Sequence, residues 1–187
     1  MNQLFVNNLS VIDFSYFDNQ RGILGESWIV DIELSGELDE QGMVFDFGHV
    51  KKKIKAIIDE ELDHRFVISK HAKNLETHCE KGVCELNWKN VMGHYQHISP
   101  ETSVLVLDVK TINPKTVANY LQEVILKELP DNVSKVAITL TQETIEGAYY
   151  HYSHGLKKHD GNCQRIVHGH RSRIEIYENH QRNTDLE

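Results

Sequence analysis

The sequence predicts an α+β fold in which helices cover one face of an antiparallel sheet. The spacing of apolar residues switches between strand and helix periods, and the elements follow the order strand pair, helix, helix, strand pair over residues 1–150. The chain has 187 residues, 40% of them hydrophobic. This length and composition are sufficient for one domain with a real core.

The first two predicted elements are strands at about residues 4–17 and 27–36. Both segments are rich in β-branched and aromatic side chains, and the second alternates well between apolar and polar residues. The stretch "GELDEQG" then supplies a loop.

The first predicted helix runs from Asp46 to Leu62. Its apolar residues recur at helical spacing: Phe47, Val50, Ile54, Ile57, Ile58 and Leu62. This helix delivers Asp63 and His64 at its C-terminal end. By itself, such a pair after a helix is also explained as a cap, because the helix dipole favours a histidine there.

The second predicted helix spans residues 113–129, and it opens with the pair "NP", a typical N-cap followed by proline at the first helical position. Three strands are predicted after it, at "VSKVAITLTQ", "GAYYHYSH" and "RIVHGHRSRIEIYE". The last two repeat the layout of "IDFSYF…GESWIVDIELSG", which indicates a partial internal repeat.

Residues 69–112 are predicted to be mostly irregular, with a polar hairpin at "CELNWKNVMGHYQH" and an apolar strand at "SVLVLDV". Cys79 and Cys84 lie here beside His78, a weak zinc signal, and we expect solvated loop residues instead. With Cys163 the cysteines number three. An odd number in a reducing compartment argues against a disulfide framework and leaves Cys163 as a free thiol.

The overall charge excludes some partners. Lysine and arginine total 20 against 28 acidic residues, a net charge of −8, which disfavours a nucleic-acid partner bound through wide phosphate contacts. The apolar runs fall far short of the roughly 20 residues that a membrane span needs, and a signal peptide is not recognisable. We therefore expect a cytoplasmic protein without a nucleic-acid or membrane partner.

The C-terminal segment carries a candidate metal site. In a strand, His168 and His170 share a face, with Gly169 between them to allow close approach, and His154 ends the preceding strand. Three imidazoles with an open fourth position are typical of catalytic zinc, although iron and nickel also accept such ligands. The alternative is that these histidines are exposed surface residues that bind no metal, because such spacings are common in a chain with 12 histidines.

The segments "GMVFDFGHVKKKI…ELDHRFVI", "NPKTVANYL", "LTQETIEGAYY" and "CQRIVHGHRSRIEI" together resemble the successive motifs of the 6-pyruvoyl-tetrahydropterin synthase and 6-carboxytetrahydropterin synthase family. The resemblance touches most of the chain. It implies the tunnelling fold, in which subunits form an oligomeric barrel with active sites at their interfaces. It also implies that His154, His168 and His170 bind Zn²⁺.

Two departures from the family pattern stand out. Ordinary members carry the zinc strands first, yet residues 1–48 contain no histidine, and Leu24-Gly25-Glu26 stands where "HGH" would be. We therefore expect residues 1–150 to form a tunnelling-fold unit with a degenerate metal site, and residues 151–187 to start a second unit that carries the ligands. A natural variant and a piece of a longer two-unit protein both remain open.

The resemblance also implies the catalytic residues. Cys163 matches the family's catalytic cysteine, which a nearby cation or metal would favour as a thiolate, and Asp63 with His64 matches its Asp-His pair. We expect His64 and Cys163 to meet across a subunit interface. A small buried cysteine is the plainer alternative for Cys163.

Substrate contacts follow in the same way. Glu143 matches the family's pterin anchor, with Glu146 as the neighbour that could be confused with it. Residues 155–173 hold five basic residues against one acid. Such a cluster would attract a triphosphate, or it is simply a solvated basic strand edge. The candidates that we assign to the substrate are Lys157, Lys158, Arg165 and Arg171.

The resulting expectation is a zinc-dependent lyase that converts 7,8-dihydroneopterin triphosphate to 6-carboxy-5,6,7,8-tetrahydropterin for deazapurine (queuosine) synthesis, and that works as a homo-oligomer. The first alternative is 6-pyruvoyltetrahydropterin synthase. The second is a non-catalytic pterin- or purine-binding oligomer, suggested by the loss of the first metal site.

Overall fold

The computed structural model describes residues 2–91, 93–154 and 168–187. Its main sheet has five strands in the order β7-β3-β1-β2-β8. The strands are β1 (Asn2–Asp18), β2 (Gly22–Gly36), β3 (Phe66–Ser69), β7 (Val104–Leu107) and β8 (Val133–Gln142). The predicted strands at 4–17, 27–36 and "VSKVAITLTQ" are thereby confirmed.

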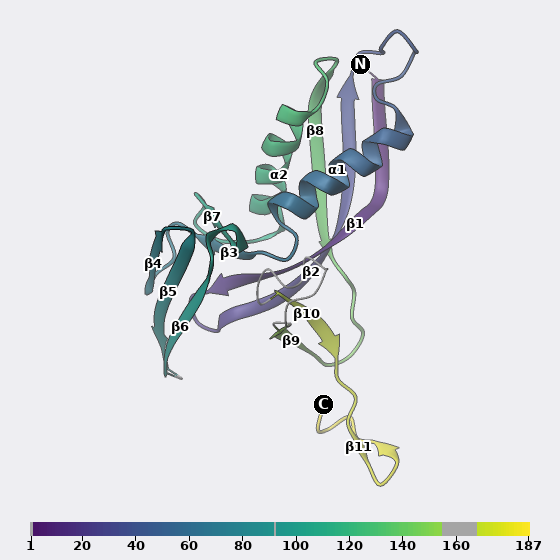
Figure 1. Ribbon diagram of the computed structural model, residues 1–187. Helices are drawn as coiled ribbons and strands as arrows, with labels where there is room; N and C mark the ends of the chain where they lie inside the picture. Colours follow the sequence, from purple (N-terminus) through teal and green to yellow (C-terminus); the bar gives the residue numbers. More distant parts are fainter. Residues whose placement is uncertain (1, 92, 155–167) are drawn as a thin grey trace.

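Two helices, α1 (Phe47–Glu61) and α2 (Pro114–Glu128), lie on one face of β1, β2 and β8, as Figure 1 shows. The predicted α+β fold with helices on one side is therefore confirmed. The core between the layers combines strand residues such as Phe14 and Val30 with Ile54 and Ile58 of α1 and Leu121 of α2, all fully buried. The apolar stripe that predicted each helix is the face that packs.

The sheet is antiparallel on its β8 side and parallel on its β7 side. β1 pairs antiparallel with β2, and β2 with β8, whereas β3 pairs parallel with β1 and β7 parallel with β3. The parallel edge follows from connectivity, because α1 carries the chain across the helical face before β3 enters beside β1.

Residues 69–112 are more regular than we expected. A three-stranded antiparallel sheet fills this region: β4 (Leu75–Glu80), β5 (Val83–Asn90) and β6 (Gly93–Pro100), followed by the 3₁₀ turn η1 (Glu101–Ser103). The prediction of a hairpin and of a strand at "SVLVLDV" was correct, but β4 was missed. Only β5 buries alternate residues, Cys84, Leu86 and Trp88, so its two neighbours carry no apolar pattern.

Cys79 and Cys84 form a disulfide, which corrects the expectation of solvated loop residues. They face each other across the β4–β5 ladder at a Cα–Cα distance of 4.0 Å, on either side of a tight turn at Lys81 and Gly82. Their spacing of five residues is what a two-residue hairpin turn needs to place them as partners.

The C-terminal segment forms two small sheets apart from the main one. β9 (Tyr149–His154) pairs with β10 (His168–Arg173), and β11 (Tyr177–Glu178) pairs with β12 (Gln181–Arg182). The strand predicted over "RIVHGHRSRIEIYE" therefore ends early, at Arg173. The β9–β10 pair packs against β1 and β2 near the lower end of the main sheet (Figure 1).

The assignment of residues 151–187 to a second unit stays a prediction.

Among the described residues, each helix falls short of the length and apolar character that crossing a bilayer requires.

Candidate metal centre and active site

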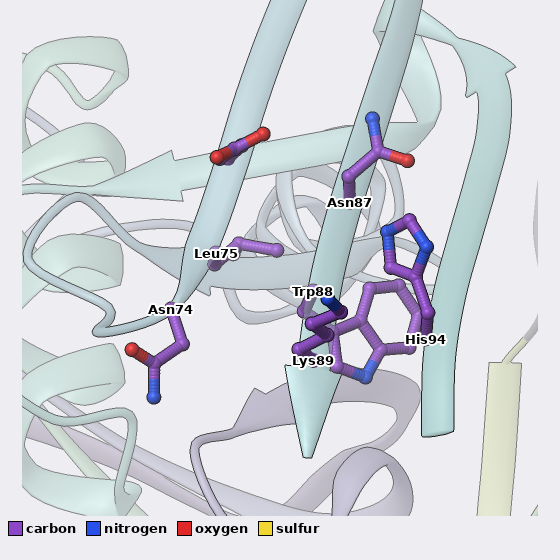
Figure 2. Close-up of a pocket in the computed structure, with 7 residues that line it drawn as sticks. Asn74, Leu75, Asn87, Trp88, Lys89 and His94 are labelled. Atoms are coloured by element: carbon purple, nitrogen blue, oxygen red, sulfur yellow. The ribbon is translucent and has the colours of Figure 1, made fainter.

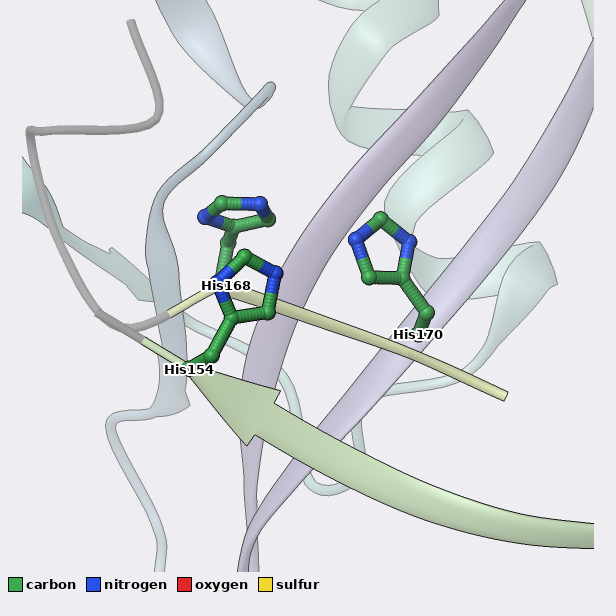
Figure 3. Close-up of side chains that lie close together, drawn as sticks. All are labelled: His154, His168 and His170. Atoms are coloured by element: carbon green, nitrogen blue, oxygen red, sulfur yellow. The ribbon is translucent and has the colours of Figure 1, made fainter. Parts of the chain in front are cut away.

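The three histidines that the spacing singled out converge. β9 and β10 pair in a register that sets His154 directly opposite His168, and His170 follows on the same face of β10. Their ligand nitrogens all lie within 4.8 Å of one another, and Figure 3 shows the three rings gathered beside β1 and β2. A tetrahedral zinc ion needs nitrogens about 3.4 Å apart, so small ring rotations would close the set around an ion.

The surroundings of His168 fit a metal ligand. The residue is 3% exposed, and its Nδ1 is buried without a hydrogen-bond partner among the described residues. Burial, and then the charges of His64, His154 and His170, lower the pKa of His168 to about 4. A buried imidazole that stays neutral keeps a lone pair for a divalent ion, which would satisfy the orphaned nitrogen.

Asp63 and His64 lie next to this cluster. His64 Nδ1 is 2.5 Å from Asp63 Oδ2, and this hydrogen bond raises the pKa of His64. The rings of His64 and His168 are 4.5 Å apart, edge to face. With Nδ1 donating to the carboxylate, His64 presents Nε2 for proton transfer.

The turn after α1 places this pair. Leu62 caps the C-terminal end of the helix, and His64 adopts the left-handed conformation with φ at 59°, so the helix does not continue through the pair. Asp63 is 8% exposed. Within one chain His64 contacts His168, whereas the expected meeting of His64 and Cys163 across a subunit interface stays a prediction. Cys163, the other half of that expectation, lies outside the described residues.

Asp13 of β1 was missed by the sequence analysis. Its Oδ1 lies 3.2 Å from His170 Nδ1 and accepts a hydrogen bond of 2.6 Å from the hydroxyl of Ser27. Its main-chain N–H donates to Asp63 Oδ1 at 2.9 Å. A lone carboxylate within the apolar strand "SVIDFSYF" was the available signal.

Arg171 has a different partner from the predicted triphosphate. Its Nε lies 2.6 Å from Glu26 Oε1, with the two side chains 8% and 2% exposed, and its Nη2 donates to the carbonyl of Glu143. The pair is close, although within the described part of the chain no acceptor is aligned with the Nε–H. Its charge is thus paired inside the protein, and the assignment of Arg171 to substrate stays a prediction.

The other predicted substrate contacts are less constrained. Glu143 and Glu146 both lie exposed in the loop after β8. Lys157, Lys158 and Arg165 lie outside the described residues, so their role stays a prediction.

The two hairpins match position by position. In β1–β2, Tyr16 pairs with Leu24 and Ser15 with Gly25, and in β9–β10, His154 pairs with His168 and Ser153 with Gly169. In these registers Leu24 and Glu26 occupy the places of the two β10 histidines, and Tyr16 occupies that of His154.

The hairpins also pack on each other through these matched positions. The hydroxyls of Ser15 and Ser153 are 3.2 Å apart, and a Cβ added to Gly25 would lie 2.4 Å from Gly169 Cα. Two glycines are needed here because the backbones touch.

A cavity of about 460 Å³ lies elsewhere, on the β4–β6 sheet, lined in part by Asn87, Trp88 and His94 (Figure 2). None of the described residues that line it is a predicted site residue. The histidine cluster is therefore the candidate active site on chemical grounds, through its converging nitrogens and the adjacent Asp-His pair.

Comparisons with known proteins identify the family and relatives of this chain. Residues 11–147 match the family model described as 6-pyruvoyl tetrahydropterin synthase. A protein of Pyrococcus horikoshii named "Putative 6-carboxy-5,6,7,8-tetrahydropterin synthase" is 27% identical over 135 residues, covering 71% of this chain and 76% of the relative. One of the same name from Methanocaldococcus jannaschii is 25% identical over 133 residues, covering 68% and 78%.

Solved structures show the same fold. The 6-pyruvoyltetrahydropterin synthase of Plasmodium falciparum superposes with a TM-score of 0.54 at 17% identity, covering 76% of this chain and 98% of that one. The Plasmodium vivax enzyme gives 0.53 at 16% identity with the same coverage.

Proposed function

The chain belongs to the 6-pyruvoyl tetrahydropterin synthase family, and we propose that it is a zinc-dependent lyase converting 7,8-dihydroneopterin triphosphate to 6-carboxy-5,6,7,8-tetrahydropterin. The observation that carries the proposal is the convergence of His154, His168 and His170 beside the Asp63–His64 pair. The choice of product is supported by three relatives named for the 6-carboxy compound.

The three imidazoles are the proposed zinc ligands. When bound there, zinc would act as a Lewis acid on the side-chain oxygens of the pterin and acidify the neighbouring C–H. The protein contributes a buried, neutral His168 and a hydrogen-bonded His170, so two of the three rings are already held in place.

Asp63 and His64 are the proposed proton carriers. Asp63 is anchored by the Asp13 N–H and holds His64 through Nδ1, so His64 can take or deliver a proton at Nε2. The raised pKa of His64 favours its protonated form, which suits the delivery of a proton to a developing oxyanion.

Cys163 and Glu143 complete the proposal. Cys163 is the proposed base that removes the side-chain proton, and Glu143 the proposed anchor that accepts two parallel hydrogen bonds from the pterin ring. Lys157, Lys158 and Arg165 are the proposed triphosphate contacts. Loss of triphosphate and carbon–carbon cleavage, with uptake of one water, then give acetaldehyde and the 6-carboxy product.

Homo-oligomer formation is also part of the proposal. β8, a ten-residue strand, is an edge of the five-stranded sheet, and its outer side lacks a partner strand in the described part of the chain. A long exposed edge is suited to pairing with another subunit, as closure of a barrel requires.

The test is product analysis with the full chain. The protein should bind about one zinc per chain. In its zinc-bound form it should release acetaldehyde and 6-carboxytetrahydropterin from 7,8-dihydroneopterin triphosphate. Cys163→Ala should abolish turnover but retain zinc, whereas His168→Ala should lose the metal. His94→Ala, on the distant β6 strand, is the matched control and should behave as the unaltered protein.

Other outcomes would change the assignment. A 6-pyruvoyl product without acetaldehyde would make the chain a 6-pyruvoyltetrahydropterin synthase. Zinc bound without any turnover would favour the non-catalytic pterin binder, and full activity in Cys163→Ala would contradict the assignment of the base.

A further inference from the structure

We propose that Asp13 is a positioning residue that orients His170 for metal binding and joins the metal centre to the Asp63–His64 pair. The inference rests on the proposed function, because it assigns a role within the same site. It goes beyond that function because Asp13 lies in the β1–β2 hairpin, whereas the three proposed zinc ligands lie in β9 and β10.

The ring of His170 lies within hydrogen-bonding distance of two side chains of the β1–β2 hairpin. Its Nδ1 lies 3.2 Å from both Asp13 Oδ1 and Ser27 Oγ, and the Ser27 hydroxyl donates to Asp13 Oδ1 at 2.6 Å. Because the hydroxyl proton goes to the carboxylate, Nδ1–H of His170 is the remaining donor in this triangle. The ring is then held as the tautomer whose Nε2 carries the lone pair that a metal needs.

The pairing of β1 with β2 places Asp13 and Ser27 side by side. Asp13 and Ser27 are directly paired across this ladder, so both side chains leave the same face of the hairpin. That face is the one against which β10 packs, with His170 above it. The carboxylate is 30% exposed and the His170 side chain 27%, so solvent is only partly excluded from this contact.

The main chain of Asp13 contacts the Asp63–His64 pair. Its N–H donates to Asp63 Oδ1 at 2.9 Å, and its carbonyl accepts the N–H of His64 at 2.8 Å. One residue therefore holds a metal ligand through its side chain and the proton-carrying pair through its backbone. A displacement of β1 at this point would move both groups together.

A carboxylate is required at position 13 because of its hydrogen-bonding character. An ionised carboxylate only accepts hydrogen bonds, so it selects a protonated Nδ1 on the ring. An asparagine can also donate through its NH₂ group and would permit the opposite tautomer. Loss of such a ligand-orienting carboxylate costs about 10- to 100-fold in metal affinity.

The experiment compares metal binding by the unaltered full chain and by Asp13→Asn. Affinities for Zn²⁺ and Co²⁺ are measured by competition with a chromophoric chelator, and the visible spectrum of the Co²⁺ form reports the coordination geometry. We expect Asp13→Asn to bind about 10- to 100-fold more weakly, with altered Co²⁺ bands. Asp31→Asn is the matched control, because Asp31 is a carboxylate of β2 that accepts from Asn8 N–H. The control should bind as the unaltered chain does.

Ser27→Ala provides a second variant should Asp13→Asn fail to fold. It removes the hydroxyl that holds the Asp13 carboxylate, and it should weaken Co²⁺ binding and shift the same bands. Unchanged affinity and unchanged Co²⁺ bands in the folded variant would overturn the role of Asp13.

The outcomes separate this inference from the proposed function. Metal bound by the unaltered chain without turnover, together with weaker binding by Asp13→Asn, would refute the lyase and support Asp13. Turnover by the unaltered chain, with equal metal affinity in Asp13→Asn, would refute Asp13 alone. An unaltered chain that binds neither metal would refute both.

Discussion

The buried ion pair between Glu26 and Arg171 predicts a large loss of stability on Glu26→Gln. The substitution keeps the volume of the side chain but removes its charge, and leaves Arg171, 8% exposed, without a counter-ion. Glu26 also accepts from Gln142 at 2.8 Å, so the carboxylate links β2, β8 and β10.

The expected magnitude follows from burial. Removing one partner of a buried pair costs about 3–5 kcal/mol, and we expect the lower end, about 3 kcal/mol, because the amide retains some hydrogen bonding. With a urea m-value of about 2 kcal/mol/M, the unfolding midpoint should fall by about 1.5 M. This is a large share of the total stability of roughly 5–15 kcal/mol that domains have.

The assay is urea unfolding followed by circular dichroism, with Asp59→Asn as the control. Asp59 pairs with Lys55 at 2.9 Å on α1, where the side chains are 29% and 53% exposed, and such helix pairs contribute only about 0.3–0.5 kcal/mol. A midpoint shift in Glu26→Gln no larger than that of the control would refute the reasoning. The double variant Glu26→Leu with Arg171→Met leaves no unpaired charge and should recover most of the stability.

Three further predictions concern other parts of the molecule. Gly25→Ala should displace β9–β10 and abolish metal binding, since its Cβ would lie 2.0 Å from the carbonyl oxygen of Tyr152; retained metal affinity in a chelator titration would contradict this. Tyr120→Phe should lower the free energy of unfolding by about 1 kcal/mol through loss of the 2.6 Å hydrogen bond to Glu61, measured by urea titration; an unchanged midpoint would count against it. Burial lowers the pKa of His97, so its stabilising effect is present above the unfolded value of about 6.5 and is lost as the pH falls through the folded pKa. Urea unfolding between about pH 7 and pH 5 should therefore show a smaller pH dependence in His97→Gln than in the unaltered chain, and equal slopes would contradict the assignment.

Much of the main fold could be predicted because its signals are local. The helical spacing that ends at Leu62 and the "NP" start of the second helix identified both helices, and capping by Asp46 and Asn113 agrees with those starts. The β4 strand could not be found in this way. Its residues are mostly exposed, so its existence depends on backbone pairing with β5 and not on any apolar pattern.

The candidate site, too, could be predicted only in part from the sequence. The His-x-His spacing placed His168 and His170 on one face, and the register of a single hairpin added His154. The roles of Asp13 and Glu26 could not be predicted. Each acts on β10 from more than 140 positions earlier in the chain, and the contact exists only because two hairpins pack face to face.

The sequence by itself determined which side chains are available: a histidine triad on one face of a hairpin, an Asp-His pair after a helix, and two helices with one apolar stripe each. Tertiary structure decided how they are used. It turned Arg171 inward to a buried carboxylate and brought Asp13 to the ring of His170. The physical reason is that local periodicity specifies which face of an element is buried, whereas the partner on that face is chosen by backbone contact between distant segments, here at Gly25 and Gly169.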